Sequence, residues 1–293
     1  MMYSGSDPRD RSRSRNGQNH KRKRNKEKTK WGALSTIVLV LAIGVFAFSL
    51  YQLAIHLLPY WQGRQESQHV QQLAIRTDPP PGVDETTWQG LWIDFEALLE
   101  TNPDTVAWLQ FESPEIINYP VVHSHDNQEY LHRSFTGEKS ILGSIFMDMN
   151  NNADFMDRNT IIYGHRMRIG GEMFAQLGMY EDIEHVRQYP KFMIYTPDGK
   201  VRLYEVFAVA IINEIAFQYQ TEFMDDDEFA AYIERAIGES KINIDWVQVL
   251  PTDRIVTLST CTPTPVRSER LIVQAVLRDI LVNVPDTSYS AQP

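Results

Sequence analysis

Cys261 is the only cysteine of this 293-residue chain, and it follows the first of two runs that favour β-strands, 255–260 and 271–277. Because the segment between the runs contains two prolines, we expect a hairpin with a stiffened loop. Cys261 then ends the first strand and Arg270 begins the second, so antiparallel pairing brings a thiol and a guanidinium to one edge of the sheet. A thiol beside a permanent positive charge can act as a nucleophile. The alternative is a small buried hydrophobic side chain.

His165 has a similar place in the sequence. It follows the strand-like run 160–163 and precedes a loop that contains Gly170 and Gly171. Histidine is the side chain that exchanges protons near neutral pH, so His165 is a candidate for acid–base chemistry beside the cysteine. The alternative is a histidine that caps or packs at the end of a strand.

Two other histidines, His123 and His125, form a pair that could bind a metal ion. No cysteine lies near them and the carboxylates around them are scattered, which favours a solvated turn. We therefore predict no metal site and no cofactor. The single cysteine also excludes an intrachain disulfide framework.

The first 63 residues combine a basic segment with an apolar one. Residues 1–30 contain 11 Lys or Arg against 3 Asp or Glu, within a chain of net charge −10. Residues 31–63 contain no Asp, Glu, Lys or Arg, and about 20 helical residues span the ~30 Å of a bilayer interior. Because an apolar segment follows the basic one, we interpret the pair as a membrane anchor and not as a nucleic-acid-binding arm. The basic segment, 1–30, is expected to stay cytoplasmic. A cleaved signal peptide is the alternative, but its apolar region would be shorter, about 7 to 15 residues.

The remaining chain predicts short strands with inserted helices. Residues 62–83 are rich in glutamine and end in prolines, which is typical of a spacer. Residues 88–100 and 223–238 have the spacing of amphipathic helices, the second with aspartates at its start. Strands are expected at 106–111, 116–122, 141–147, 160–163, 192–196, 201–212, 255–260 and 271–277. The pattern indicates a mainly β, mostly antiparallel domain, either a closed barrel or a sandwich.

Several motifs, taken together, resemble those of sortases. The catalytic set is TLSTC at 257–261, an arginine nine positions later, and YGH at 163–165 followed by a loop and MF. Other segments are similar to class B sortases in particular: NPDTVAWLQF at 102–111, NYPVV at 118–122, DNQEYLHRSF at 126–135 and GSIFMD at 143–148. The resemblance extends from about residue 88 to residue 281.

The resemblance implies a mainly β fold, a closed eight-stranded barrel with inserted helices, preceded by an N-terminal transmembrane helix. It also implies the roles of four residues. Cys261 would be the nucleophile, His165 the acid and base, and Arg270 the positive group that steadies substrate and oxyanion. Ser259 falls where the family lines its substrate groove. Arg267 is the rival to Arg270, but it lies inside the proline-containing loop, whereas Arg270 opens the strand.

The activity implied is that of a membrane-anchored cysteine transpeptidase. Such an enzyme cleaves a C-terminal sorting motif of a secreted protein through a thioester and joins the new carboxyl end to an amine of a lipid-linked peptidoglycan precursor. Expected partners are therefore secreted proteins with a sorting motif, this cell-wall precursor and the cytoplasmic membrane of a Gram-positive bacterium, and no nucleic acid. Two alternatives stay open: an anchored cysteine peptidase that uses water, and a non-catalytic cell-surface β-domain that binds a partner.

The expected organisation has five parts. They are a disordered basic cytoplasmic tail (1–30), a transmembrane anchor helix (31–58), an extracellular spacer (59–86), a sortase catalytic domain (87–283) and a C-terminal tail (284–293). The single membrane helix would leave the N-terminus cytoplasmic and the catalytic domain extracellular.

Overall fold

The computed structural model describes residues 10–76, 91–111, 117–167, 169–261 and 268–282, and the chain divides into two compact units, Met1–Leu58 and Pro59–Pro293. The expected C-terminal tail, 284–293, lies outside the described residues. Each unit is described by itself below.

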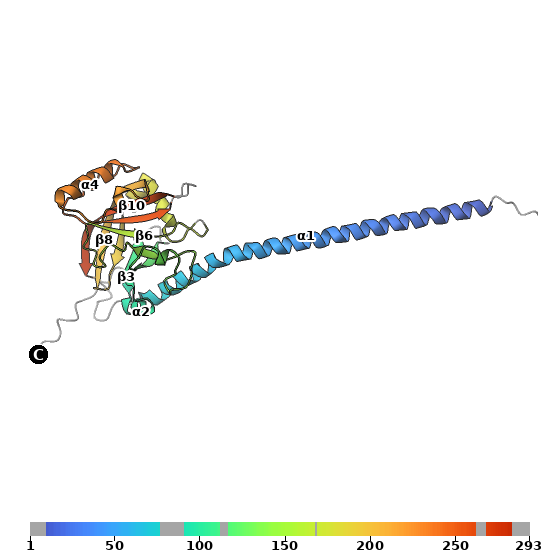
Figure 1. Cartoon of the computed structure of the whole chain (residues 1–293), viewed down its shortest axis with the longest axis horizontal. Coiled ribbons are helices and arrows are strands. Elements are labelled where there is room, and N and C mark those ends of the chain that lie inside the picture. Colours follow the sequence, from blue (N-terminus) through green and yellow to red (C-terminus); the bar gives the residue numbers. More distant parts are fainter. Residues whose placement is uncertain (1–9, 77–90, 112–116, 168, 262–267, 283–293) are drawn as a thin grey trace, which may run out of the picture. The chain divides into compact units, whose positions relative to one another are not determined.

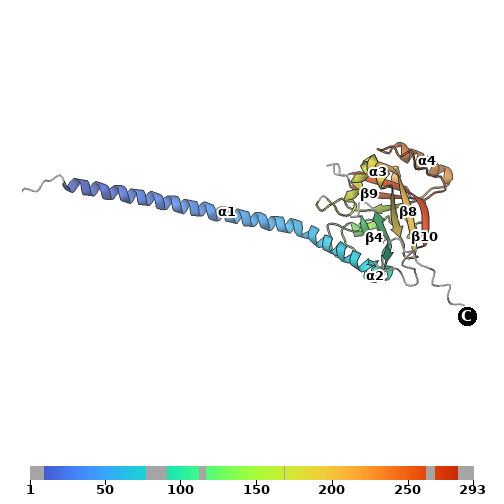
Figure 2. The same ribbon diagram turned by 180° about the vertical axis from the view of Figure 1, so that it is seen from behind.

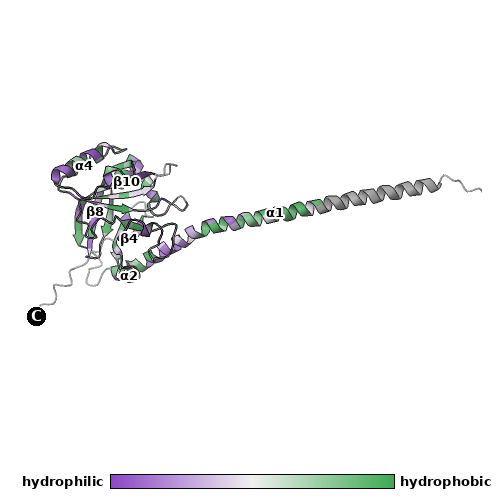
Figure 3. Ribbon diagram, viewed as in Figure 1, coloured by the Kyte–Doolittle hydropathy of each residue, from purple (hydrophilic) through white to green (hydrophobic). Residues whose placement is uncertain are grey.

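The described part of the first unit is helical and forms most of the long helix α1 (Asp10–Ala74; Figure 1). From Leu34 to Leu58 every side chain is exposed, and Figure 3 shows this stretch as predominantly hydrophobic. The helix is long and apolar enough from Leu34 onward to be a candidate membrane span. The expected disordered tail differs from the structure, in which the helix begins at Asp10. Residues 10–30 contain no proline and many lysines and arginines, which tolerate a helix well.

The second unit begins with the last turns of α1, which we call the domain-side segment (Pro59–Ala74). We expected a spacer here, but Val70 and Ala74 are buried against the rest of the domain. These two apolar residues are four positions apart and therefore share one helical face. We predicted a spacer because residues 62–83 are rich in glutamine, which is polar. Glutamine is also a good helix former.

Eight strands form a closed barrel in the order β10-β8-β7-β3-β4-β5-β6-β9, as expected from the family resemblance. The strands are β3 (Thr105–Phe111), β4 (Asn118–His123), β5 (Ile145–Met147), β6 (Asn159–Tyr163), β7 (Lys191–Tyr195), β8 (Lys200–Asn213), β9 (Ile255–Cys261) and β10 (Glu269–Val282). Strand β10 pairs with both β8 and β9 and so closes the barrel. All pairs are antiparallel except β4–β5 and β6–β9.

Short helices connect the strands, and a two-stranded pair, β1 (Ile75–Arg76) and β2 (Trp92–Ile93), follows α1. The helices are α2 (Phe95–Thr101), η1 (Glu129–Leu131), η2 (Phe174–Glu181), α3 (Ile183–Gln188), η3 (Phe217–Tyr219) and α4 (Asp226–Gly238). Figure 2 shows α2 at the opposite end of the barrel from α3 and α4.

The helix expected at 88–100 is shorter than predicted. Trp92 belongs to β2, and α2 starts only at Phe95, because the side chain of Asp94 caps the helix by accepting a hydrogen bond from Ala97 N at 3.1 Å. Residues 88–90 lie outside the described residues. The helix expected at 223–238 is confirmed as α4, with Asp225 as its N-cap.

Candidate active site

The parallel pairing of β6 with β9 brings two distant parts of the sequence to one edge of the barrel. Tyr163 is paired with Ser259, and Gly164 N donates to Ser259 O at 3.1 Å. His165 follows Tyr163 by two residues, as Cys261 follows Ser259. Because strands in parallel pairs end at the same edge, the backbones of His165 and Cys261 lie at that edge together.

The hairpin of β9 and β10 brings the third residue. Cys261 pairs with Arg270, the register that the sequence predicts for a hairpin with these two residues at its rim. The side chain of Cys261 is outside the described part of the structure, so its place is given by its backbone in β9. The rival arginine, Arg267, also lies outside the described residues.

A pocket with an empty volume of about 700 Å³ opens at this edge. It is lined by Asn127, Leu131, Phe146, Tyr163, Gly164, His165, Glu214, Tyr219, Ser259, Thr260 and Arg270. The pocket therefore contains three of the four residues singled out from the sequence, and the fourth, Cys261, directly follows Thr260. Six of the other lining residues lie inside the sequence motifs quoted above, although no role was assigned to them, and only Glu214 and Tyr219 lie outside those motifs.

His165 is oriented by the main chain. Its Nε2 lies 2.7 Å from Leu131 O, and because a carbonyl oxygen can only accept, Nε2 carries the hydrogen of this bond. Nδ1 is then the ring nitrogen that is left to exchange a proton. We identified no orienting carboxylate from the sequence, and the partner found is a peptide carbonyl, which no residue type can signal.

Arg270 forms an ion pair that we did not predict. Its Nη2 lies 2.8 Å from Glu214 Oε2, and its Nη1 donates to Glu269 O at 3.1 Å. The arginine side chain is 23% exposed, so the guanidinium is partly shielded from water at the wall of the pocket. Glu214 compensates part of the positive charge of Arg270 and fixes the orientation of its guanidinium. A planar guanidinium held in one orientation can make two parallel hydrogen bonds.

Ser259 lies in the wall of the pocket, but its hydroxyl already has a partner. Its Oγ is 2.7 Å from the hydroxyl of Tyr219, a residue of η3, and Ser259 itself is 2% exposed. The pair joins β9 to the loop that follows β8.

Two more polar groups shape the pocket wall. The hydroxyl of Tyr163 donates to Asp148 Oδ2 at 2.8 Å, and burial, followed by this carboxylate, raises the pKa of Tyr163 far above its usual value. Tyr163 is therefore a neutral wall residue. Thr260 Oγ1 is buried and finds no hydrogen-bond partner among the described residues, which is uncommon for a buried hydroxyl.

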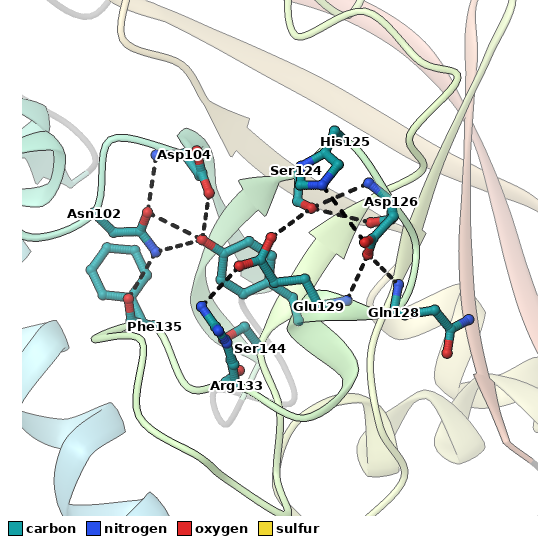
Figure 4. Close-up of polar contacts among 11 residues, drawn as sticks. Asn102, Asp104, Ser124, His125, Asp126, Gln128, Glu129, Arg133, Phe135 and Ser144 are labelled. Atoms are coloured by element: carbon teal, nitrogen blue, oxygen red, sulfur yellow. Dashed lines mark hydrogen bonds and ion pairs between the residues drawn. The ribbon is translucent and has the colours of Figure 1, made fainter.

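The two histidines set aside in the sequence lie at the end of β4 and just after it. His123 lies at the end of β4, and the exposed His125 has its Nε2 3.9 Å from Asp126 Oδ2. Figure 4 shows this contact between His125 and Asp126. Within the described ranges, no group of three or more His, Cys, Asp or Glu residues could hold a metal ion.

Comparisons with known proteins identify the family. The family model described as a sortase domain matches residues 110–278, more than half of the chain. Sortase B of Listeria monocytogenes is 36% identical over 181 residues, which cover 61% of this chain and 72% of that protein. Sortase B of Staphylococcus aureus is 35% identical over 169 residues, which cover 57% of this chain and 67% of that protein.

Solved structures agree. Sortase B from Bacillus anthracis in complex with AAEK1 superimposes with a TM-score of 0.63 at 31% identity, covering 75% of this chain and 98% of that one. The S. aureus sortase B–substrate complex gives a TM-score of 0.58 at 30% identity and covers 63% and 84% of the two chains. With its closed barrel and the matching sequence motifs, the chain belongs to the sortase family of cysteine transpeptidases, and within it to the class B sortases.

Proposed function

We propose that this enzyme is anchored in the cytoplasmic membrane, cleaves a C-terminal sorting motif of secreted proteins and joins them to an amine of a cell-wall precursor. The observation that supports it most is the parallel register of β6 and β9, which gives His165 and Cys261 a common edge although they are far apart in sequence. Arg270 reaches the same edge through β10.

The first half of the reaction cleaves the substrate. The thiolate of Cys261 attacks the carbonyl carbon of the scissile peptide bond, and the resulting oxyanion is stabilised by Arg270 and nearby backbone N–H groups. The C–N bond then breaks, and the departing amine takes a proton from Nδ1 of His165, since Nε2 is engaged with Leu131. The product is a thioester between Cys261 and the secreted protein.

The second half transfers the acyl group. An amine attacks the thioester carbonyl and gives its proton to the now neutral Nδ1 of His165. The C–S bond breaks, the thiolate of Cys261 is regenerated, and a new peptide bond is formed. The same imidazole thus acts once as acid and once as base. We assign Ser259, through its bond with Tyr219, to the wall that receives the sorting motif.

The proposed location follows from the first unit. The exposed apolar side chains of α1 require a nonpolar environment, and the basic residues before them favour a cytoplasmic N-terminus. The sole cysteine allows a direct test. A thiol reagent that does not cross membranes should label Cys261 on intact cells. Labelling only after the cells are opened would place the catalytic domain inside and contradict the proposal.

Activity is tested on the full chain in detergent with a sorting-motif peptide, with and without an amine. We expect a ligated product that appears only with amine and is lost in Cys261→Ala, while the thermal unfolding temperature of that variant stays close to that of the wild type. Hydrolysis at a rate that amine does not change would instead identify a peptidase. No thiol labelling in the folded protein, with labelling in denaturant, would favour a non-catalytic domain.

A further inference from the structure

Gly143 lies beside the ring of His165 and beside the carbonyl that holds it. Its φ of +59° is in the left-handed region, which glycine adopts without strain. A Cβ added there would lie 2.6 Å from Tyr130 O, 2.8 Å from Leu131 O and 3.0 Å from His165 Cδ2. A side chain at 143 would therefore press on both the imidazole and the carbonyl that holds it.

The carbonyls facing Gly143 cannot easily move away, because Tyr130 is fixed at both ends. Its backbone carbonyl accepts a hydrogen bond from Ser144 N at 2.9 Å. Its hydroxyl donates to Asp104 Oδ2 at 2.7 Å and accepts from Asn102 Nδ2 at 3.0 Å, in the network of Figure 4. The segment that carries Leu131 is thus anchored to the start of β3.

The opposite side of this loop is held by the domain-side segment of α1. A Cβ at Gly63 would lie 2.6 Å from a methyl carbon of Leu142, the residue before Gly143. Glu66 Oε1 accepts hydrogen bonds from Thr136 N at 3.1 Å and Thr136 Oγ1 at 2.6 Å. One helical segment therefore contacts the loop at two points.

The same helical segment also reaches the chain that follows His165. Arg64 Nε lies 3.5 Å from Oε1 of Glu172, which is buried. Phe174 N, two residues later, donates to His165 O at 2.9 Å. The two stretches of chain beside the histidine, 131–144 and 172–174, are thus both tied to α1.

We propose that Gly143 is a positioning residue for His165, and that the domain-side segment of α1 keeps it in place by packing Gly63 against Leu142. Because Gly143 has no side chain, the Leu131 carbonyl can stay within hydrogen-bond distance of His165 Nε2. This hydrogen bond fixes the orientation of the ring and leaves Nδ1 to exchange the proton. The inference rests on the proposed function, because it assigns the purpose of this packing to the acid–base step. If the inference is correct, disturbing the packing around Gly143 lowers kcat more than it raises KM.

A matched pair of glycine variants tests the first part. Gly137 lies in the same loop with φ +88°, but a Cβ there meets nothing within 4 Å. Gly137→Ala and Gly143→Ala therefore share the strain of a positive φ and differ in the collision with Leu131 and His165. We expect Gly143→Ala to lower kcat by on the order of tenfold or more with KM little changed, and Gly137→Ala to stay within about twofold of the wild type.

The ring itself provides a readout that a purely structural role would not move. Nitrogen NMR of labelled histidine in the full chain should show hydrogen on Nε2 of His165 in the wild type and in Gly137→Ala, and a changed tautomer ratio in Gly143→Ala. An unchanged tautomer ratio in Gly143→Ala would overturn the inference. A wild-type protein without amine-dependent activity would contradict the proposed function. The tautomer comparison would still decide whether Gly143 positions His165.

A rescue experiment tests the contribution of the helix and also serves if Gly143→Ala does not fold. Gly63→Ala raises helix propensity but collides with Leu142, so it should lower kcat and alter the His165 tautomer ratio. Adding Leu142→Ala removes the colliding methyl groups and should restore both. A Gly63→Ala variant with unchanged kcat and tautomer, or a double variant that restores neither, would contradict the role of the helix.

Discussion

The pair formed by Arg270 and Glu214 defines what the guanidinium can do at the pocket wall. Glu214 holds one nitrogen and the carbonyl of Glu269 holds another, so the positive charge has a fixed direction. A lysine at this position would keep the charge but would present a single ammonium on a flexible stem.

We therefore expect Arg270→Lys to lower kcat by roughly tenfold to a hundredfold, because an oxyanion donor is misplaced. Steady-state kinetics with peptide and amine provide the measurement. Glu214→Gln is the control, since an amide keeps a hydrogen bond to Arg270 and should cost less. A lysine variant with wild-type kcat would remove the planar group from the mechanism.

His185 predicts a pH dependence of stability. Burial between the rings of Tyr180 and Tyr189 lowers the pKa of His185, and the carboxylate of Asp182 opposes only part of this effect. The unfolded chain then binds a proton on this residue more readily than the folded one. Its contribution to stability is present above the usual histidine pKa, ~6.5, and is lost as the pH falls below it.

Replacing His185 with Phe should thus make the unfolding temperature fall less between pH 7 and pH 5. Thermal unfolding at several pH values measures this slope. The exposed His132, replaced in the same way, should leave the slope unchanged. Equal slopes for wild type and His185→Phe would refute the assignment.

At the residue scale, the sequence offered candidates for the chemistry but not the groups that position them. Cys261, His165 and Arg270 carry side chains whose reactivity is visible in their type. Leu131 contacts His165 through its carbonyl, and Gly143 fits beside the ring because it has no side chain, so neither residue type signals a role. Their importance depends on contacts between segments that only the fold brings together.

Among the elements, α4 shows how a short sequence signal sets a boundary. Asp225 is the N-cap, and its Oδ1 accepts a hydrogen bond from Glu228 N at 2.9 Å. The next residue, Asp226, forms an ion pair with Arg158. Asp225 and Asp226 thus have different interactions although the sequence presents them alike.

Asp225→Ala should lower the free energy of unfolding by about 1 kcal/mol, because one helical N–H loses its acceptor. Asp227→Ala is the matched control, since Asp227 is exposed and is not the cap, and only a few tenths of a kcal/mol are expected from its charge at the helix start. Denaturant unfolding measures both changes. A larger loss for Asp227→Ala would show that charge, not capping, stabilises this end.

Each of the eight strands overlaps a predicted run, because alternating and continuous apolar runs between turn residues are local signals, but β5 is shorter than the predicted 141–147 and β10 is longer than the predicted 271–277. Their pairing is not local. The sheet is mostly antiparallel, as expected, and only the pairs β4–β5 and β6–β9 are parallel. The β6–β9 pair is the one that brings the backbones of His165 and Cys261 to the same edge. The short β2 replaces part of an expected helix because Trp92 pairs with Arg76, a contact across chain that no local pattern contains.

For the whole molecule, the boundary between the units lies inside α1, at Pro59. A chain that starts at Pro59 should keep the unfolding temperature of the second unit. A chain that starts at residue 75 loses the buried Val70 and Ala74 and the contact of Gly63 with Leu142, so we expect unfolding about 5 to 15 °C lower. Calorimetry of both chains measures the difference. Equal temperatures would make the domain-side segment a simple linker.

Barrel closure has a consequence for the order of synthesis. The histidine strand β6 is made about a hundred residues before the nucleophile strand β9, and β10 must follow before β9 has both neighbours. A ribosome therefore exposes an incomplete barrel until residue 282 has emerged. The edge that carries Cys261 and His165 therefore gains its full set of hydrogen-bonded neighbours only after β10 has been made.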